Sequence, residues 1–393
     1  MKEEKYLFSL QNRGIRLGLE RTQKLLEACQ LPNKENKIIQ ILGTNGKGST
    51  SAILSNILKN NGYKVGLYTS PHIYSFVERI RVNGIAISIN EVSDFLNKHR
   101  LHIDNLEASF FETMTVMALW YFKKSNVDYA IMETGLGGKF DSVTACGAKI
   151  FGITSISIDH ENILGDNLED IANEKIAAIS KESSVFYVNQ KKHINKIIED
   201  YCNINKCGLK KIKTNFDLQL SLPGDHQKQN ASLAAAIAKS IIPDLKNINS
   251  ALLSTKWFGR NQIIKKNPYI IFDVAHNEDG MKSFLKYINN INCEFNNKFL
   301  ILSIQKTKNI NKVSKELSSY FDNIIYTITD EKKSMDFNII SKQMKKTIFI
   351  KSPIEAIDYA LSKSTEKDLI CILGTHFWGE AVKTKFNISF DNL

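Results

Sequence analysis

Residues 43–50 read Gly-Thr-Asn-Gly-Lys-Gly-Ser-Thr, between an apolar run at 38–42 and a stretch with the apolar periodicity of a helix. Three glycines in a strand-to-helix turn let backbone N–H groups approach an anion, and the helix start adds the positive end of its dipole. A lysine at this position can reach the outer phosphates of a nucleotide, and a hydroxyl after it can meet Mg²⁺. We therefore predict an ATP-binding loop made of Gly43, Thr44, Asn45, Gly46, Lys47, Gly48, Ser49 and Thr50.

The loop departs from the usual Walker pattern at one position. That pattern has its first glycine five residues before the Gly-Lys pair, where this chain has Ile41. A tight connection without a ligand is therefore an alternative interpretation. The order of strand, loop and helix, together with Lys47 and the hydroxyls that follow it, favours phosphate binding.

The composition is that of a globular protein: 393 residues, 43% hydrophobic and 24% charged, with a net charge of +11. No apolar run approaches the roughly 20 residues of a membrane-spanning helix. The lysines are interspersed with asparagine and isoleucine, so we interpret the charge as a solvated surface without affinity for nucleic acid. The six cysteines are scattered and are expected to be reduced thiols. We expect a cytoplasmic protein that binds neither nucleic acid nor membrane.

Short β-branched runs alternate with helical stretches, which is typical of a parallel sheet wound with helices. In the first half, strands are expected at 37–42, 64–68, 127–132, 149–158 and 184–188. The pattern restarts after Trp257, with strands expected at 269–273, 298–303, 323–327, 347–351 and 368–373. We predict an α/β protein with a P-loop ATP-binding domain at 1–254, built on a mainly parallel wound sheet, and a smaller Rossmann-like domain at 258–393. The ligand site should lie between the two domains.

Polar residues follow the first four expected strands. The phosphate loop follows the first strand, and Ser70, Glu133 and His160 follow the next three. Each residue alone has a structural explanation, such as a turn, an ion pair or a helix cap. Because ligands of wound sheets bind at the carboxyl ends of the strands, their shared location favours a site. Oxygen ligands beside phosphates suit Mg²⁺, and a histidine beside them suggests a second metal position.

Lys175 lies within an apolar stripe. At helical spacing, the segment 168–179 has the apolar positions Leu168, Ile171, Ala172, Ile176 and Ile179. The lysine can extend its amine outward to water, or it can lie in the site with a lowered pKa. A neutral amine can react with carbon dioxide, and the resulting carbamate would be an anionic metal ligand.

These motifs, taken together, resemble the folylpolyglutamate synthase and dihydrofolate synthase family of the Mur ligase superfamily. The resemblance runs from about residue 17 to residue 380. In order, the matching segments are the phosphate loop, Tyr-Thr-Ser-Pro-His at 68–72, Glu-Arg-Ile-Arg at 78–81, Glu-Thr-Gly-Leu-Gly-Gly at 133–138, Ser-Ile-Asp-His at 157–160, Glu-Lys at 174–175, His-Gln-Lys-Gln-Asn at 226–230, Trp-Phe-Gly-Arg at 257–260 and Asp-Val-Ala-His-Asn at 273–277.

The resemblance implies an ATP-dependent ligase that joins the amine of L-glutamate to a carboxylate through an acyl phosphate. It implies a first Mg²⁺ on Ser70 and Glu133, a second on His160, and a carbamylated Lys175; Lys47, Lys175, His160 and Glu133 form the catalytic set. Further ATP contacts implied by the family are Asn230, Arg260 and Asp273. The family places His276 near the incoming glutamate, and its pterin-side segments correspond to Leu17, Gly18, Phe110 and Phe111. A monomer is the expectation at family level.

The acceptor is dihydropteroate, a reduced folate, or both. The segments at 17–21 and 110–111 favour the use of dihydropteroate, and we expect a bifunctional enzyme. Departures from the family pattern, such as Lys139-Phe-Asp-Ser-Val-Thr144 after the double glycine, affect the details of substrate contact. A monofunctional synthase, another Mur-type ligase and a small-molecule P-loop kinase remain alternatives. A kinase would need neither an inward Lys175 nor an arginine and an aspartate from a second domain.

Overall fold

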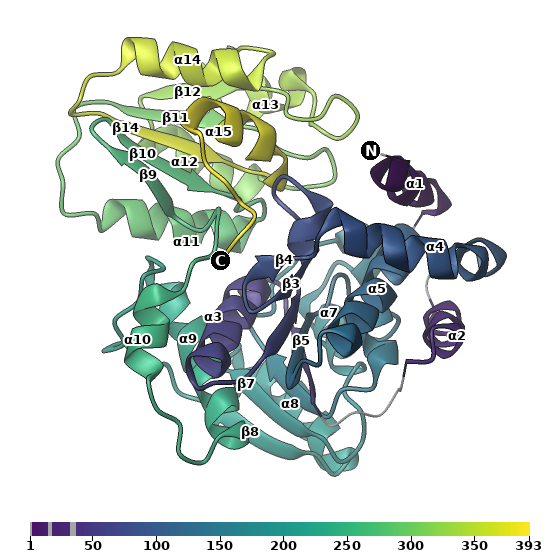
Figure 1. Ribbon diagram of the computed structural model, residues 1–393. Coiled ribbons are helices and arrows are strands. Elements are labelled where there is room, and N and C mark those ends of the chain that lie inside the picture. The colour runs from purple at the N-terminus through teal and green to yellow at the C-terminus, as the bar shows by residue number, and fades with distance from the viewer. Residues whose placement is uncertain (1, 15–17, 32–36) are drawn as a thin grey trace.

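The computed structural model describes residues 2–14, 18–31 and 37–393. Within them the chain forms two α/β domains, each built on one sheet, and Figure 1 shows the second domain above the first. The N-terminal helix α1 (Lys2–Ser9) lies beside the first domain. No helix among the described residues is both long and apolar enough to cross a bilayer.

The first sheet has eight strands in the order β4-β3-β2-β5-β1-β6-β7-β8. The six strands from β2 to β8 in this order pair in parallel, while β3 and β4 form an antiparallel hairpin at one edge. The strands are β1 (Ile38–Leu42), β2 (Val65–Tyr68), β3 (Ile80–Val82), β4 (Ile85–Ala86), β5 (Tyr129–Glu133), β6 (Ile150–Ile153), β7 (Ser184–Val188) and β8 (Gly208–Ile212).

Helices cover both faces of this sheet because the apolar side chains of its central strands point both ways. On β1, Ile39 and Ile41 pack with the helices of one face, while Ile38 and Leu42 pack with those of the other. One face carries α3 (Lys47–Asn60), α9 (Asp225–Ile241) and α10 (Ile248–Ser254). The opposite face carries α2 (Glu20–Ala28), α4 (Ile89–Asn105), α5 (Phe110–Lys124), α7 (Leu168–Ile176) and α8 (Lys192–Ile204).

The second sheet has six strands in the order β13-β12-β11-β14-β10-β9, and only β9 runs antiparallel to its neighbour. They are β9 (Gln262–Lys266), β10 (Tyr269–Asp273), β11 (Lys298–Leu302), β12 (Asn323–Tyr326), β13 (Ile348–Phe349) and β14 (Leu369–Leu373). One face packs on α11 (Glu278–Asn289), α12 (Asn311–Tyr320) and α13 (Phe337–Gln343), and the other on α14 (Pro353–Lys363) and α15 (Gly379–Phe386).

The end of the chain returns from the second domain to the edge of the first sheet. The backbone N–H of Leu393 donates to the carbonyl of Gly84 at 3.0 Å, and the Arg81 guanidinium donates to the carbonyl of Phe390 at 2.8 Å. In Figure 1 the C-terminus accordingly lies near β3 and β4. The two domains are therefore joined at this edge by the C-terminal segment as well as by the chain connection after α10.

The expected strands of both sheets are confirmed, with two differences. The strand expected at 149–158 ends at Ile153, because the chain then turns to run beside the phosphate loop. The strands β3, β4, β8 and β9 were not predicted from the sequence. They are short or edge strands, and β8 and β9 each carry two lysines, so they lack the apolar signal of a central strand.

Candidate active site between the domains

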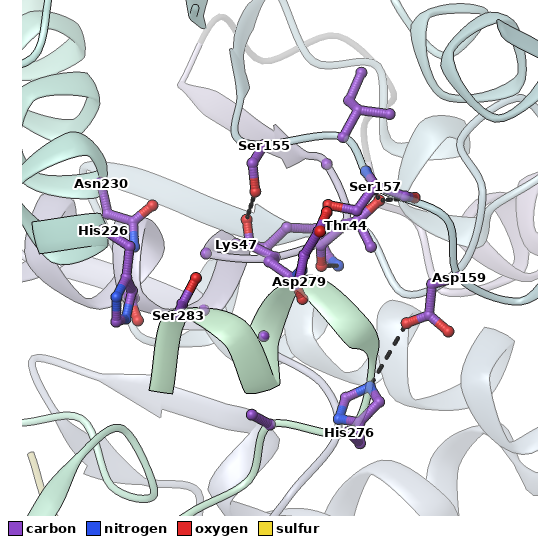
Figure 2. Close-up of a pocket in the computed structure, with 18 of the residues that line it drawn as sticks. Thr44, Lys47, Ser155, Ser157, Asp159, His226, Asn230, His276, Asp279 and Ser283 are labelled. Carbon is purple, nitrogen blue, oxygen red and sulfur yellow. Dashed lines mark hydrogen bonds and ion pairs between the residues drawn. The ribbon is translucent and has the colours of Figure 1, made fainter. Parts of the chain in front are cut away.

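A cavity of about 600 Å³ lies where the carboxyl ends of the first sheet face the second domain. Figure 2 shows Lys47 within it, with His226 and Asn230 on one side and Asp159 and His276 on the other. Most of the residues singled out from the sequence line this cavity: Gly43, Thr44, Asn45, Gly46, Lys47, Gly48, Ser49, Ser70, Glu133, His160, Lys175, Asn230, Arg260, Asp273 and His276.

Four other residues singled out from the sequence lie outside the cavity lining, and Leu17 lies outside the described residues. Thr50 is buried one turn into α3, and Gly18 precedes α2. Phe110 is buried against Phe8 and the Arg79 guanidinium. Phe111 is nearest the cavity, because a Cβ added at Gly135, which lines it, would lie 2.4 Å from the Phe111 ring.

The phosphate loop needs its glycines for conformation and for space. Gly43 and Gly46 have φ values of 133° and 92°, which side chains rarely adopt. A Cβ at Gly46 would lie 2.3 Å from the Asn230 side-chain oxygen, and one at Gly48 would lie 2.9 Å from the Trp257 ring. The backbone of this loop is thus packed directly against α9 and the segment that follows α10.

The segment after β6 holds the loop in place. Thr44 donates its backbone N–H to the Ser155 carbonyl at 2.7 Å, and its hydroxyl bridges the backbone of Ser157. The Ser49 hydroxyl, in contrast, is buried without a hydrogen-bond partner among the described residues, although Ser49 lines the cavity. An unpaired buried hydroxyl at this place fits a metal or phosphate ligand, since buried polar groups otherwise find partners.

Glu133 and Ser70 meet at the adjacent ends of β5 and β2. The backbone N–H of Ser70 donates to the Glu133 carboxylate at 3.1 Å. Burial raises the pKa of Glu133, and the positive charge of Lys47 opposes that rise. Three or more metal-ligating side chains do not gather anywhere in the described part of the chain. Mg²⁺ characteristically takes one or two carboxylates and completes its shell with water and phosphate, so this pair suits an ion bound with a nucleotide.

Lys175 points into the cavity from α7 and does not extend outward to water. It is 5% exposed and lies beside Ile171, Ala172 and Ile176, which are also buried. Burial lowers the pKa of its amine to about 7, and the charge of Lys47 acts in the same direction. At neutral pH a large fraction of this amine is therefore uncharged and nucleophilic.

His160 follows Asp159 at the end of the β6 segment. Burial lowers the pKa of His160 to about 4, so its imidazole is neutral at physiological pH and its ring nitrogen can bind a metal. Burial alone would raise the pKa of Asp159, but a hydrogen bond to His276 and the charge of Lys308 hold it far below its usual range. Asp159 is therefore a permanent buried anion.

The second domain supplies the opposite wall of the cavity. The Asp273 carboxylate accepts the backbone N–H groups of Asn261 and Ala275, at 2.6 and 2.7 Å, and burial raises its pKa against the charge of Arg260. The Asn277 side chain exchanges two hydrogen bonds with Asn45 of the phosphate loop, at 3.0 and 3.1 Å. The carboxyl end of β10 thus faces the carboxyl ends of the first sheet.

Four residues of this arrangement were not among the predicted site residues: Asp159, Asn277, Lys308 and His376. Asp159 and Asn277 were quoted within motifs, so their neighbours His160 and His276 were the available signal. His376 lines the cavity with its ring centroid 5.5 Å from that of His276. Lys308 had no signal, because it follows β11 among several other lysines and only its tertiary contacts distinguish it.

Two family models match the chain: the Mur ligase middle domain over residues 41–215 and the Mur ligase glutamate ligase domain over residues 259–376. The fold and the cavity thus define a Mur-type ligase. The chain is 32% identical to the dihydrofolate synthase/folylpolyglutamate synthase of Bacillus subtilis, over 93% of this chain and 94% of that protein. It belongs to the dihydrofolate synthase/folylpolyglutamate synthase family and is an ATP-dependent ligase.

Solved structures agree with this assignment. A folylpolyglutamate synthase from Thermotoga maritima is 29% identical, with 98% of this chain and 97% of that chain covered and a TM-score of 0.82. E. coli FolC, in a complex with DHPP and ADP, is 25% identical, with 97% of each chain covered and a TM-score of 0.88.

Proposed function

We propose that this enzyme ligates L-glutamate to a pterin carboxylate, converting dihydropteroate to dihydrofolate and extending reduced folates with further glutamates. One observation carries the proposal: a single cavity gathers the phosphate loop, Glu133, the inward amine of Lys175 and Arg260 of the second domain. Phosphoryl transfer to a small molecule alone would require only the first two. The remaining groups suit a reaction in which an activated acid must be held away from water until an amine arrives.

The ATP phosphates lie on the backbone of the loop from Asn45 to Thr50, with the Lys47 amine near the transferred group. Further ATP contacts come from Asn230, Arg260 and Asp273. The unpaired Ser49 hydroxyl and the close packing of Gly46 and Gly48 support this placement. In the known E. coli FolC complex ADP is bound, and the two chains align over nearly their full length.

Two divalent ions assist, the first held by Ser70 and Glu133 and the second by His160, with a carbamylated Lys175 as an additional anionic ligand. When bound, such ions spread the charge of the transferred phosphoryl group. The protein keeps the metal-binding side chains in the protonation states that metal binding and carbamylation require. The low pKa of His160 leaves its imidazole neutral, and the pKa of about 7 leaves Lys175 able to react with carbon dioxide.

The reaction then proceeds in two balanced steps. A carboxylate oxygen of the pterin substrate attacks the γ-phosphorus of ATP, the bond to the β-phosphate oxygen breaks, and ADP leaves. The uncharged amine of glutamate attacks the acyl carbon, phosphate leaves, and the amine nitrogen loses a proton. Lys47 stabilises the transferred negative charge in the first step, and the second domain keeps water from the acyl phosphate before the second step.

Substrate selection comes from both domains. His276, next to the cavity wall formed by β10, contacts the incoming glutamate. Gly18, Phe110, Phe111 and Leu17 belong to the pterin side, and the contact of Phe111 with Gly135 brings that side to the rim of the cavity. E. coli FolC binds DHPP, which supports a pterin-type acceptor for this chain.

The proposal also assigns residues 1–254 to the ATP-binding domain and residues 258–393 to the glutamate ligase domain, consistent with matches at 41–215 and 259–376. The enzyme acts as a monomer in the cytoplasm. The resemblance to the family and the globular composition support both the monomeric state and the cytoplasmic location.

The test is a product assay with the purified protein, ATP, Mg²⁺ and glutamate, with either dihydropteroate or a reduced folate, and with products separated by mass. We expect a mass increase of one glutamyl unit with dihydropteroate and a series of such increases with the folate. Phosphate should be released only when glutamate and the pterin acid are both present. Glutamate-independent phosphorylation of a small molecule would instead identify a kinase.

A further inference from the structure

One ion pair between the two domains is almost completely buried. Lys308, in the loop after β11, places its amine 2.6 Å from an Asp159 carboxylate oxygen, and the two side chains are 6% and 8% exposed. Among the ion pairs of residues 2–14, 18–31 and 37–393, it is the only one whose two side chains are both less than a tenth exposed.

Asp159 holds two further groups of the second domain. Its second oxygen accepts the Asn277 amide at 3.0 Å and lies 3.6 Å from a His276 ring nitrogen. Asn277 also forms two side-chain hydrogen bonds with Asn45 of the phosphate loop. The partner that Asp159 has within its own domain is the backbone N–H of His160, at 2.8 Å. A single carboxylate of the first domain thus contacts three side chains of the second domain, and one of these, Asn277, also bonds to the phosphate loop.

The energy of this pair depends on domain closure. A buried carboxylate without a cation is strongly unfavourable, and so is a buried ammonium without an anion. When the domains are apart, water solvates both charges. When the domains close, each charge compensates the other, provided that their geometry is as close as it is here. The pair therefore discriminates sharply between a complete and a partial closure.

When the domains close through this ion pair, the positive charge of Lys308 also comes to lie beside His160. The Lys308 amine lies 3.4 Å from the Nε2 atom of His160, which lines the cavity. We propose that Asp159 and Lys308 are positioning residues that latch the second domain over the phosphate loop and set the position of the His160 side chain, so that turnover requires complete closure. The expected loss of turnover rests on the proposed function, whereas the expected loss of domain closure rests on the structure alone.

The test uses the variants Lys308→Met, Asp159→Asn and their combination, each in the full-length protein. We expect each single change to lower kcat about 30-fold or more, with the Kd for ATP altered less than threefold, because ATP contacts other groups. The double variant should be no slower than the slower single variant, since both changes remove one interaction. Lys308→Arg, which can still pair with Asp159, should recover a large part of the rate.

Lys383→Met is the matched control. Lys383 also reaches across the domains, with its amine 3.5 Å from the centre of the Tyr74 ring, but this contact lies at a more exposed place away from the cavity. Its loss removes a lysine from the same interface without touching Asp159. We expect kcat to stay within about twofold of the wild-type value.

Closure is measured directly by energy transfer between dyes on Leu101→Cys in α4 and the exposed native Cys293, with Cys207→Ser to prevent a third label. A non-hydrolysable ATP analogue should shorten this distance in wild type and in Lys383→Met, but less in Lys308→Met and Asp159→Asn. The inference is overturned if these two variants close like the wild type, or if Lys383→Met loses closure and rate equally. If the wild type closes but ligates no glutamate, the proposed function fails while the closure result still decides the latch.

Discussion

The first domain holds its part of the cavity with contacts inside that domain, whereas the second domain also depends on contacts that cross the interface between the domains. The phosphate loop is fixed by Ser155 and Ser157 of the neighbouring strand end, and its Gly46 packs on α9. Asn277 and Lys308 bond across the interface to Asn45 and Asp159, which line the cavity in the first domain. The phosphate loop is therefore positioned by the first domain, and the second domain completes the cavity around it. Substitutions in the two regions should separate affinity from turnover.

The largest effect is expected for Lys175→Ala, which should lower kcat about 10³-fold while ATP affinity stays within about threefold. The amine is buried in the cavity, and its carbamate would be an anionic metal ligand at the transferred phosphate. Short carboxylic acids should restore part of the rate, measured as phosphate release. Lys196→Ala, at an exposed position of α8, is the control. Full activity of Lys175→Ala would exclude the role.

The next effect is expected in the first domain alone. Gly46→Ala should weaken ATP binding about 10- to 100-fold, because φ is 92° and the new Cβ would lie 2.3 Å from Asn230. Gly62→Ala has nearly the same φ, 88°, and no atom within 4 Å of the new Cβ, so it measures backbone strain alone. Calorimetric titration should show wild-type affinity for Gly62→Ala. Equal affinity in both variants would mean that the contact with Asn230 is unimportant.

A smaller effect is expected for the second domain. Asn277→Ala should lower kcat about tenfold with little change in ATP affinity, because the bonds to Asn45 and Asp159 hold the closed arrangement. Asn277 also caps α11, so Ser352→Ala, which removes the cap of α14 in the same domain, serves as control. Both variants should lose about 1 kcal/mol of stability. Only Asn277→Ala should lose turnover, and an equal loss in Ser352→Ala would assign the effect to stability.

The smallest effect concerns stability and pH. The pKa of Lys175 is about 7 in the folded protein, which is below its value in an unfolded chain. At a pH between these two pKa values the unfolded chain binds a proton that the folded protein does not. The free energy of unfolding therefore rises with pH over this range. Burial of the charged amine is most costly below pH 7. Lys175→Met should therefore stabilise the protein by roughly 1 to 4 kcal/mol at pH 6 and by less at pH 9.5. Urea unfolding in carbonate-free buffer measures this, and an equal gain at both pH values would contradict it.

Much of the fold could be predicted because its signals are local. The phosphate loop, the ten expected strands and the place of Lys175 within an apolar stripe each depend on a short segment with a clear period or composition. The stripe did not decide whether the Lys175 amine extends to water or points into the cavity, which the tertiary structure shows. The edge strands β4, β8 and β9 escaped prediction because a strand at the edge of a sheet needs few apolar residues, and β3 escaped because it has only three residues. Phe110 packs against Phe8 and Arg79 while Phe111 packs against Gly135 of the cavity lining, and an aromatic pair in the sequence does not say which ring lies nearer the cavity.

The sequence by itself determined the chemistry that the first domain can offer: a glycine-rich phosphate loop, a carboxylate and an imidazole at successive strand ends, and a lysine within an apolar helical stripe. Only the tertiary structure decided how the second domain completes the site. Lys308 is 149 residues from Asp159, and Asn277 is 232 residues from Asn45. No local pattern encodes such a contact, because a lysine in a loop becomes a buried partner only when two independently formed sheets bring their carboxyl ends together.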